Sequence, residues 1–301
     1  MRIGISPAVF SAGGILLTWH GLFTILAVVA GVYLMLRWAK AKGIVSDVVL
    51  TSTVWAILGG IIGARLVHVI DLWSELYGPD PVKIVMLWNG GLDVLGGILG
   101  GLGAVCVYHA WSGFVFAMSD VTLFGLRFKC PTVSLDYGKA EFVRFRKLLD
   151  VAALALPVAL IVGRIAGILT GSETGTATNL PWSIIYTHPD SRAYQNFQFS
   201  STHPAVAYEM LLTAAIFGAV WFMKDRVRPD GMLFAVFMGL YSINRFFVGF
   251  VRFNKAWLSG MGIAQLIALV ILIVLVPLVS YRIQLMRHGE EARPARNLRR
   301  S

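Results

Sequence analysis

"YSINRFFVGFVR", residues 241–252, places two arginines in a run of aromatic and aliphatic residues that otherwise has the composition of a membrane span. An arginine at membrane depth is costly unless it reaches the interface or finds a partner. At about 3.6 residues per turn, Arg245 and Arg252 lie two turns apart on one face of a helix. The stretch therefore predicts a transmembrane helix with a charged face that needs either a counter-ion or a ligand.

The composition of the whole chain agrees with a membrane protein. Of its 301 residues, 57% are hydrophobic and 14% are charged, whereas soluble domains are about 45–50% apolar and about 25% charged. The sequence predicts an all-α polytopic membrane protein that forms one bundle over residues 1–301. Its seven apolar spans are expected at about 15–37, 48–72, 93–117, 149–171, 205–224, 231–251 and 262–285.

The positive charges indicate the topology. Most of the 26 lysine and arginine residues fall in the segments after the first, third, fifth and seventh spans. The positive-inside rule then places the N-terminus outside and the C-terminus in the cytoplasm. Membrane topology and contact with lipid headgroups explain most of the net charge of +10. This explanation argues against a nucleic-acid partner.

Three segments outside the spans differ in character. Residues 118–148 are expected to form a cytoplasmic insert, in which the alternation of "VTLFGLRF" favours a small hairpin. Residues 172–204 are expected to form a long extracytoplasmic loop, and long loops are often functional. Residues 286–301 form a basic cytoplasmic tail.

Glycine-rich runs such as "GGIIGAR" are typical of membrane helices that pack closely.

Charged residues within the spans gather toward the outer side. Arg164 lies near the outer end of the fourth span and Glu209 lies early in the fifth. Together with Arg245 and Arg252 they suggest a site for an anion, and a phospholipid phosphate suits the planar fork of arginine. Two simpler interpretations stay open: Arg252 reaches the interface as a lone cation, or Arg164 and Arg245 form buried ion pairs with Glu209.

Six motifs follow one another along the chain. They are "WHGLF" (19–23), "GGIIGARLVHV" (59–69), "WNGGLDVLGGILGG" (88–101), "VGRIAGILTGSETG" (162–175), "HPAVAYE" (203–209) and "LYSINRFFVGFVR" (240–252). In this order they resemble the prolipoprotein diacylglyceryl transferase family of bacteria. The family transfers the diacylglyceryl group of phosphatidylglycerol to the lipobox cysteine thiol of secreted preprolipoproteins and releases glycerol phosphate.

The resemblance implies a multi-pass enzyme of the bacterial inner membrane that uses no cofactor or metal, and we expect a monomer. Carried over by position, Arg164 binds the lipid phosphate, and Arg245 acts in the cation network at the outer opening. Gly175, Glu209 and Arg252 shape the phosphatidylglycerol site.

Several positions depart from the family's motifs. Leu95 stands where the family has a histidine, Gly167 replaces an asparagine, Gly249 a glutamate and Val206 a glutamine. A tyrosine of the first span is His20 here. The thiol attacks best as thiolate, and an imidazole can accept its proton. His20 is therefore a candidate catalytic base, although a histidine beside Trp19 is equally typical of a membrane interface.

Two other functions compete with the transferase. The lost polar residues favour a non-catalytic paralogue that binds phospholipid or acts as a membrane scaffold. A transporter with a midplane site is less consistent, because the sequence has no visible inverted repeat and its charges gather toward one side.

Overall fold

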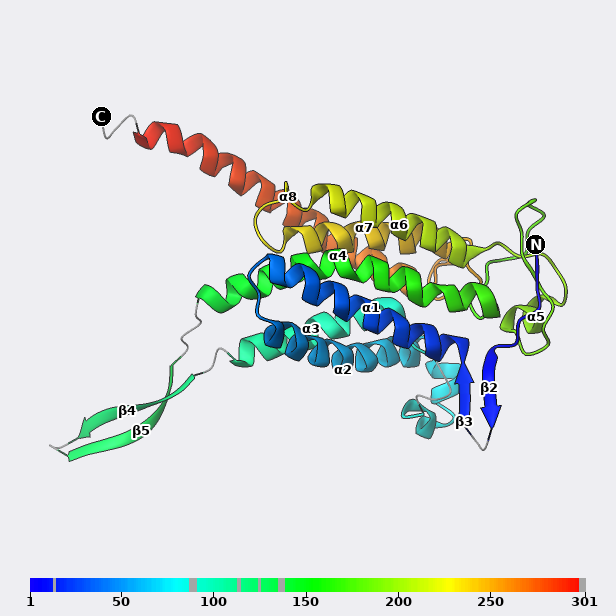
Figure 1. Cartoon of the computed structure of the whole chain (residues 1–301), viewed down its shortest axis with the longest axis horizontal. Helices are drawn as coiled ribbons and strands as arrows, with labels where there is room; N and C mark the ends of the chain where they lie inside the picture. Colours follow the sequence, from blue (N-terminus) through cyan, green and yellow to red (C-terminus); the bar gives the residue numbers. More distant parts are fainter. Residues whose placement is uncertain (13–14, 87–90, 113–114, 124–125, 135–138, 298–301) are drawn as a thin grey trace. The chain divides into compact units, whose positions relative to one another are not determined.

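The computed structural model (Figure 1) is helical over most of its length. It describes residues 1–12, 15–86, 91–112, 115–123, 126–134 and 139–297. The helices are α1 (Trp19–Ala41), α2 (Ser46–Asp71), α3 (Val94–Ser112), α4 (Lys139–Thr170), α5 (Arg192–Phe197), α6 (Ala205–Met223), α7 (Met232–Gly249) and α8 (Ile263–Asn297), with short η1 (Trp73–Tyr77) and η2 (Pro81–Ile84).

Six short strands form three separate pairs. They are β1 (Arg2–Ile3) with β6 (Ile185–Tyr186) in parallel, and two antiparallel pairs, β2 (Ala8–Ala12) with β3 (Ile15–Thr18) and β4 (Val115–Leu123) with β5 (Leu126–Ser134). The last pair is the hairpin predicted within the 118–148 insert. Of that insert, residues 124–125 and 135–138 lie outside the described residues.

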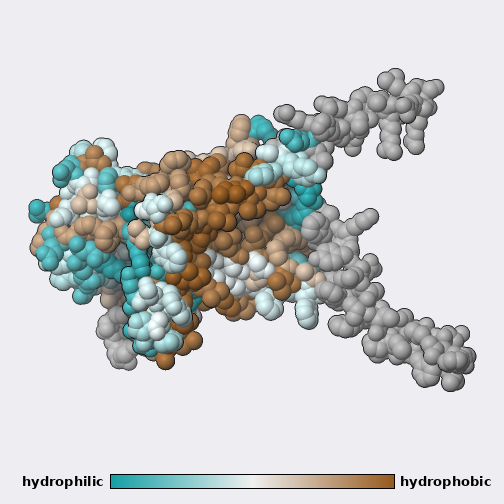
Figure 2. All heavy atoms as spheres, turned by 180° about the vertical axis from the view of Figure 1, so that it is seen from behind, coloured by the Kyte–Doolittle hydropathy of each residue, from teal (hydrophilic) through white to brown (hydrophobic). Residues whose placement is uncertain are grey.

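Seven of the described helices are long and apolar enough to cross a membrane, which confirms the predicted fold class. Figure 2 shows the apolar side chains that cover the outside of these helices, as expected for surfaces that face lipid. The boundaries differ in places. The first span begins at Trp19 rather than at 15, because Ile15–Thr18 pairs as a strand. The third ends at Ser112, and α8 continues as helix to Asn297 through most of the basic tail.

The helices fall into two compact units, Val32–Val151 and the combination of Met1–Gly31 with Ala152–Ser301. In the first unit, α2 and α3 pack through glycines. A Cβ atom built on Gly59 would lie 2.5 Å from the carbonyl oxygen of Gly100, and one on Gly63 would overlap the carbonyl of Gly96. Small residues permit this close approach of backbones. The packing interpretation of the glycine-rich runs is therefore confirmed.

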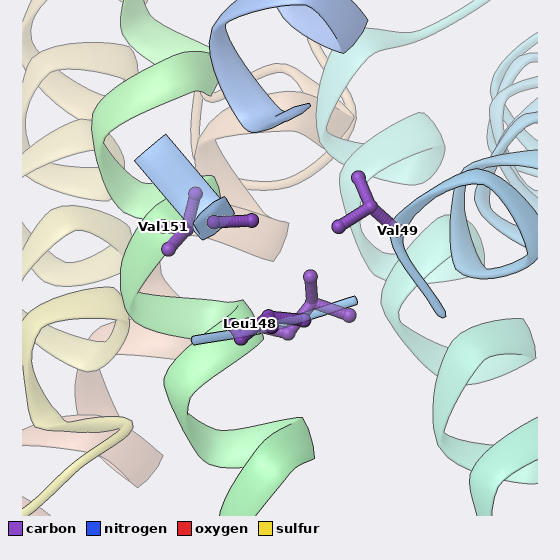
Figure 3. Packing of buried hydrophobic residues seen from close by; sticks show 5 residues of the cluster. Val49, Leu148 and Val151 are labelled. Carbon is purple, nitrogen blue, oxygen red and sulfur yellow. The ribbon is translucent and has the colours of Figure 1, made fainter. Parts of the chain in front are cut away.

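A small apolar cluster holds the other end of the same unit. Val49 packs with Leu148 and Val151 (Figure 3), and Ala39 and Ile44 complete the cluster. All five are at most 6% exposed. α4 begins at Lys139, ten residues before the predicted span, and its extension includes Leu148 of this cluster.

Arg65 has a structural role in this unit. Its guanidinium donates to the backbone carbonyls of Ile84 (2.9 Å), Gly91 (3.2 Å), Lys83 (2.5 Å) and Met86 (3.1 Å). The positive charge of Arg65, which lies within an apolar helix, is thus satisfied by peptide dipoles. Arg65 therefore fixes the segment after η1.

In the second unit, α7 carries the buried face that positions the site. Its buried residues recur every three or four positions, from Phe234 through Phe237 and Tyr241 to Arg245 and Val248. This spacing is that of one helix face. The predicted polar face is therefore turned into the protein, and Arg245 is only 6% exposed.

Candidate functional site: three arginines and two glutamates

Glu209, in the second turn of α6, is the centre of a buried ionic cluster. Its Oε1 accepts hydrogen bonds from Nη2 of Arg164 (2.7 Å) and Nη1 of Arg245 (3.0 Å). Its Oε2 accepts one from Nη1 of Arg252 (3.0 Å). Glu209 is 1% exposed. A buried carboxylate is stable only when it is paired and hydrogen-bonded, and here three guanidinium groups supply the pairing.

The backbone of Glu209 is also held in place. The hydroxyl of Thr213 donates to the carbonyl oxygen of Glu209 (2.6 Å), and Nδ2 of Asn244 on α7 donates to the Thr213 hydroxyl (3.3 Å). The hydroxyl of Tyr241 lies 3.4 Å from Oε1 of the carboxylate. These contacts join α6 to α7 and fix the position of the central carboxylate.

Glu173 is the second carboxylate of the cluster, and the sequence analysis did not identify it. Its Oε2 accepts hydrogen bonds from Nη1 of Arg164 and Nη2 of Arg252. It follows the end of α4 in a non-helical segment, and 30% of its side-chain surface is exposed. The only sequence signal was its position in "TGSETG", between two predicted site residues.

The guanidinium groups keep Glu173 ionised. Burial disfavours the charged carboxylate, but the charges of Arg164 and then Arg252 outweigh burial and lower the pKa of Glu173 well below its ordinary value. Three guanidinium groups therefore face two carboxylates, which leaves one net positive charge at the site.

This arrangement decides between the interpretations that the sequence left open. Arg164 and Arg245 do form buried ion pairs with Glu209. Arg252 is not a lone interfacial cation, because its side chain is 9% exposed and contacts both carboxylates. It also lies beyond α7, which ends at Gly249. Arg245 and Arg252 therefore meet at Glu209, although only Arg245 is on the helix.

Gly175 lets the segment of Arg252 approach. The two residues pair as an antiparallel bridge, and the amide of Gly175 donates to the carbonyl of His203 (3.1 Å). A Cβ atom at position 175 would lie 2.5 Å from Cβ of His203 and 2.8 Å from the carbonyl oxygen of Val251. The glycine is thus required by close packing that holds Arg252 beside Glu173.

His20, in the first turn of α1, lies next to this cluster. Its Nε2 is hydrogen-bonded with Oγ of Ser172, the neighbour of Glu173 in the chain. Oγ1 of Thr170 lies 3.4 Å from the same nitrogen and donates to the carbonyl of Ala166 (2.9 Å). Since the Thr170 proton is directed at Ala166, Thr170 can only accept from His20. When Nε2 carries no proton, Ser172 is the group that donates to it.

Four of the departures from the family's motifs lie at packed positions. Gly167 on α4 and Val206 on α6 face each other: a Cβ atom at 167 would lie 3.4 Å from both methyl groups of Val206. At position 249 a Cβ atom would overlap Gln265, which donates to the carbonyl of Phe246 (3.1 Å). Leu95 is fully buried. The lost polar side chains at these positions are therefore replaced by packing.

Comparisons with known proteins point to one family. The family model described as prolipoprotein diacylglyceryl transferase matches residues 7–128 and 132–281. The chain is similar to proteins named phosphatidylglycerol–prolipoprotein diacylglyceryl transferase. One from Dehalococcoides mccartyi is 30% identical over 96% of this chain and 98% of its own. One from a Nostoc species is 27% identical (87% and 84%), and one from Clostridioides difficile is 28% identical (87% and 89%).

Proposed function

The chain belongs to the prolipoprotein diacylglyceryl transferase family, and from this we propose that it transfers the diacylglyceryl group of phosphatidylglycerol to the lipobox cysteine of preprolipoproteins. The thiolate sulfur attacks the carbon of the diacylglyceryl group that is bonded to a phosphate oxygen. A carbon–sulfur bond forms, the carbon–oxygen bond to phosphate breaks, and glycerol phosphate leaves with the electron pair. The thiol proton passes to a base.

The observation that carries this proposal is the convergence of Arg164, Arg245 and Arg252 on one point. They come from α4, from α7 and from the segment after α7, and each side chain is less than 10% exposed. Arginine binds phosphate oxygens in pairs. In a site with little water, such a group stabilises the negative charge that develops on the leaving phosphate. We assign lipid phosphate binding to Arg164 and Arg252, and the cation network of the reaction to Arg245.

We assign the role of base to His20. The carboxylate cluster itself is a poor base, because its guanidinium partners favour the ionised carboxylates and weaken their attraction for a proton. A neutral imidazole can accept the proton of a thiol, and Nε2 of His20 contacts Ser172 beside the cluster. A thiol that takes the place of the Ser172 hydroxyl at Nε2 would find its proton acceptor there.

The topology of the helices supports a site at one side of the membrane. Arg164 and Glu173 lie at the end of α4, His20 at the start of α1, Glu209 at the start of α6 and Arg252 just after α7. Spans that alternate in direction bring these four ends to the same side. With the N-terminus outside, this is the outer side of a bacterial inner membrane, where secreted preprolipoproteins emerge.

The test is a transferase assay with purified protein, phosphatidylglycerol in detergent micelles and a lipobox peptide. We expect glycerol phosphate release and a peptide heavier by one diacylglyceryl group. Arg164→Ala should abolish both. Arg228→Ala, which removes an arginine whose side chain is 75% exposed, should retain them.

One result would contradict the proposal: saturable phosphatidylglycerol binding that depends on Arg164 but is never followed by modification of the peptide. It would favour the non-catalytic paralogue. Binding and turnover are therefore measured on the same preparations.

A further inference from the structure

The two carboxylates of the cluster are held very differently. Glu209 is on a helix, is 1% exposed, and has its backbone carbonyl bound by Thr213. Glu173 is in the short non-helical segment after α4, and 30% of its side-chain surface is exposed. Glu173 can therefore turn away from the arginines more easily than Glu209, which is enclosed by contacts with Tyr241 and Asn244 of α7.

Glu209 also makes more contacts with the arginines than Glu173 does. Glu209 binds with both oxygens, and its contacts include all three arginines. Glu173 binds Arg164 and Arg252 through one atom, Oε2. A single oxygen that bridges two guanidinium groups occupies the position that one oxygen of a phosphate would take between them.

We propose that Glu173 is a displaceable placeholder that holds the anion position between Arg164 and Arg252 until the phosphate of the lipid takes its place. This rests on the proposed function, since it names a second role within the same site. Glu209 is then the permanent counter-ion of the cluster, and Glu173 the exchangeable one.

The exchange avoids a costly intermediate state. Buried guanidinium groups without an anionic partner are strongly unfavourable. If one anion replaces another, Arg164 and Arg252 stay paired throughout, and the empty site is stable as well. The consequence is competition: the lipid binds more weakly than it would to a site without Glu173.

The exchange also changes the charge of the site. With Glu173 bound, the cluster has one net positive charge; with Glu173 turned away, it has two. A phosphodiester such as that of phosphatidylglycerol carries one negative charge. The leaving glycerol phosphate is a monoester and, with a second pKa of about 6, approaches two negative charges at neutral pH. The site without Glu173 therefore matches the leaving group rather than the intact lipid.

The test is equilibrium binding of Glu173→Gln, which keeps the shape and removes the charge. The probe is phosphatidylglycerol with a fluorescent acyl chain, in micelles of fixed lipid fraction and without peptide. We expect the dissociation constant to fall at least about fivefold, with a matching fall in KM. Asp190→Asn, which removes a carboxylate whose side chain is 78% exposed, should leave both unchanged.

Glycerol phosphate as a soluble competitor distinguishes the lipid from a free phosphate. Glu173→Gln should tighten the binding of both probes, because they share the phosphate group. A gain for glycerol phosphate alone would overturn the assignment to the lipid.

Unchanged or weaker lipid binding by Glu173→Gln would also overturn the proposal. Thermal unfolding of the variant guards against misfolding, and Glu173→Ala, which leaves no side chain to bridge the arginines, should repeat the gain. A purely structural role would lower the unfolding temperature without tightening binding. The binding measurement contains no peptide, so its result does not depend on the transferase assay. Wild-type protein that binds lipid but fails to modify the peptide in the transferase assay contradicts the proposed reaction. The comparison of Glu173→Gln with wild type in the binding measurement still tests the role of Glu173. Wild-type protein that does not bind phosphatidylglycerol contradicts both.

Discussion

Arg164 contacts both carboxylates of the site, Glu173 with Nη1 and Glu209 with Nη2, so a single guanidinium group links the exchangeable anion to the permanent one. The planar fork uses a separate terminal nitrogen for each contact and holds both in one plane. The relationship distinguishes Arg164 from a simple point charge, and a charge-conserving substitution tests it.

Arg164→Lys should therefore be far more harmful than its retained charge suggests. A single ammonium lacks the two separate nitrogens and the planar geometry of the guanidinium, and we expect kcat/KM to fall by about 10²–10³-fold, the usual loss when a transition-state donor is removed. The measurement is the transferase assay at varied phosphatidylglycerol fraction, with Arg228→Lys as the matched control. Near-normal kcat/KM in Arg164→Lys would show that charge alone is sufficient.

Glu209→Gln should destabilise the protein more than any other neutralisation in the cluster. It leaves Arg164, Arg245 and Arg252 with only Glu173 as an anionic partner, and breaking a buried ion pair costs about 3–5 kcal/mol. The unfolding temperature in detergent should fall clearly, compared with Asp190→Asn. Adding Arg245→Met should recover part of the loss, because the two residues are coupled. Strictly additive losses would contradict the coupling.

His20→Ala tests the assignment of the base. We expect a large fall in kcat/KM and the loss of the rise in rate with pH that accompanies deprotonation of a general-base histidine. Phosphatidylglycerol binding should be retained, since His20 lies outside the arginine cluster. Ser172→Ala should shift the pH profile without abolishing activity, because its hydroxyl positions Nε2. Full transferase activity in His20→Ala would exclude this histidine as the base.

The facing pair Gly167 and Val206 predicts a compensating double substitution. Gly167→Asn alone should destabilise the protein, because the added side chain would press against the two methyl groups of Val206, which lie 3.4 Å from a Cβ atom at this position, and would disturb Glu173, whose Oε2 lies 4.0 Å from it. Adding Val206→Gln supplies a polar partner in that position, as in the family's motifs. The unfolding temperature of the double variant should therefore exceed the value expected from the two single variants. Additivity would mean that the two positions changed independently.

The sequence predicted the arginines and Glu209 well because each is costly where it stands. A charge inside an apolar span requires a partner, and Arg164, Arg245 and Glu209 satisfy one another as that rule demands. Glu173 has no such signal, since a carboxylate in a polar loop costs nothing. What brings it to the arginines is a reversal of the chain after α4 at Gly171, whose φ of +62° favours glycine.

Boundaries were predicted less well where apolar runs are ambiguous. Hydrophobicity alone does not separate a strand from the start of a helix, so Ile15–Thr18 was assigned to the first span although it pairs with Ala8–Ala12. Arg252 was placed on the helix because its spacing from Arg245 fits two turns. The structure ends α7 at Gly249 and brings Arg252 to Glu209 through its bridge with Gly175, a tertiary contact that no local pattern encodes.

The parallel pairing of β1 with β6 has a consequence for biogenesis. Arg2 and Ile3 pair with Ile185 and Tyr186, and Ile3 is buried with Ile184 and Ala193. Four spans lie between the two strands in the chain. Residues 2 and 3 therefore cannot form this pairing until the fourth span and the segment after it have been synthesised. The same segment carries Glu173, and Glu209, Arg245 and Arg252 follow later in the chain, so the ionic cluster is completed only late in synthesis.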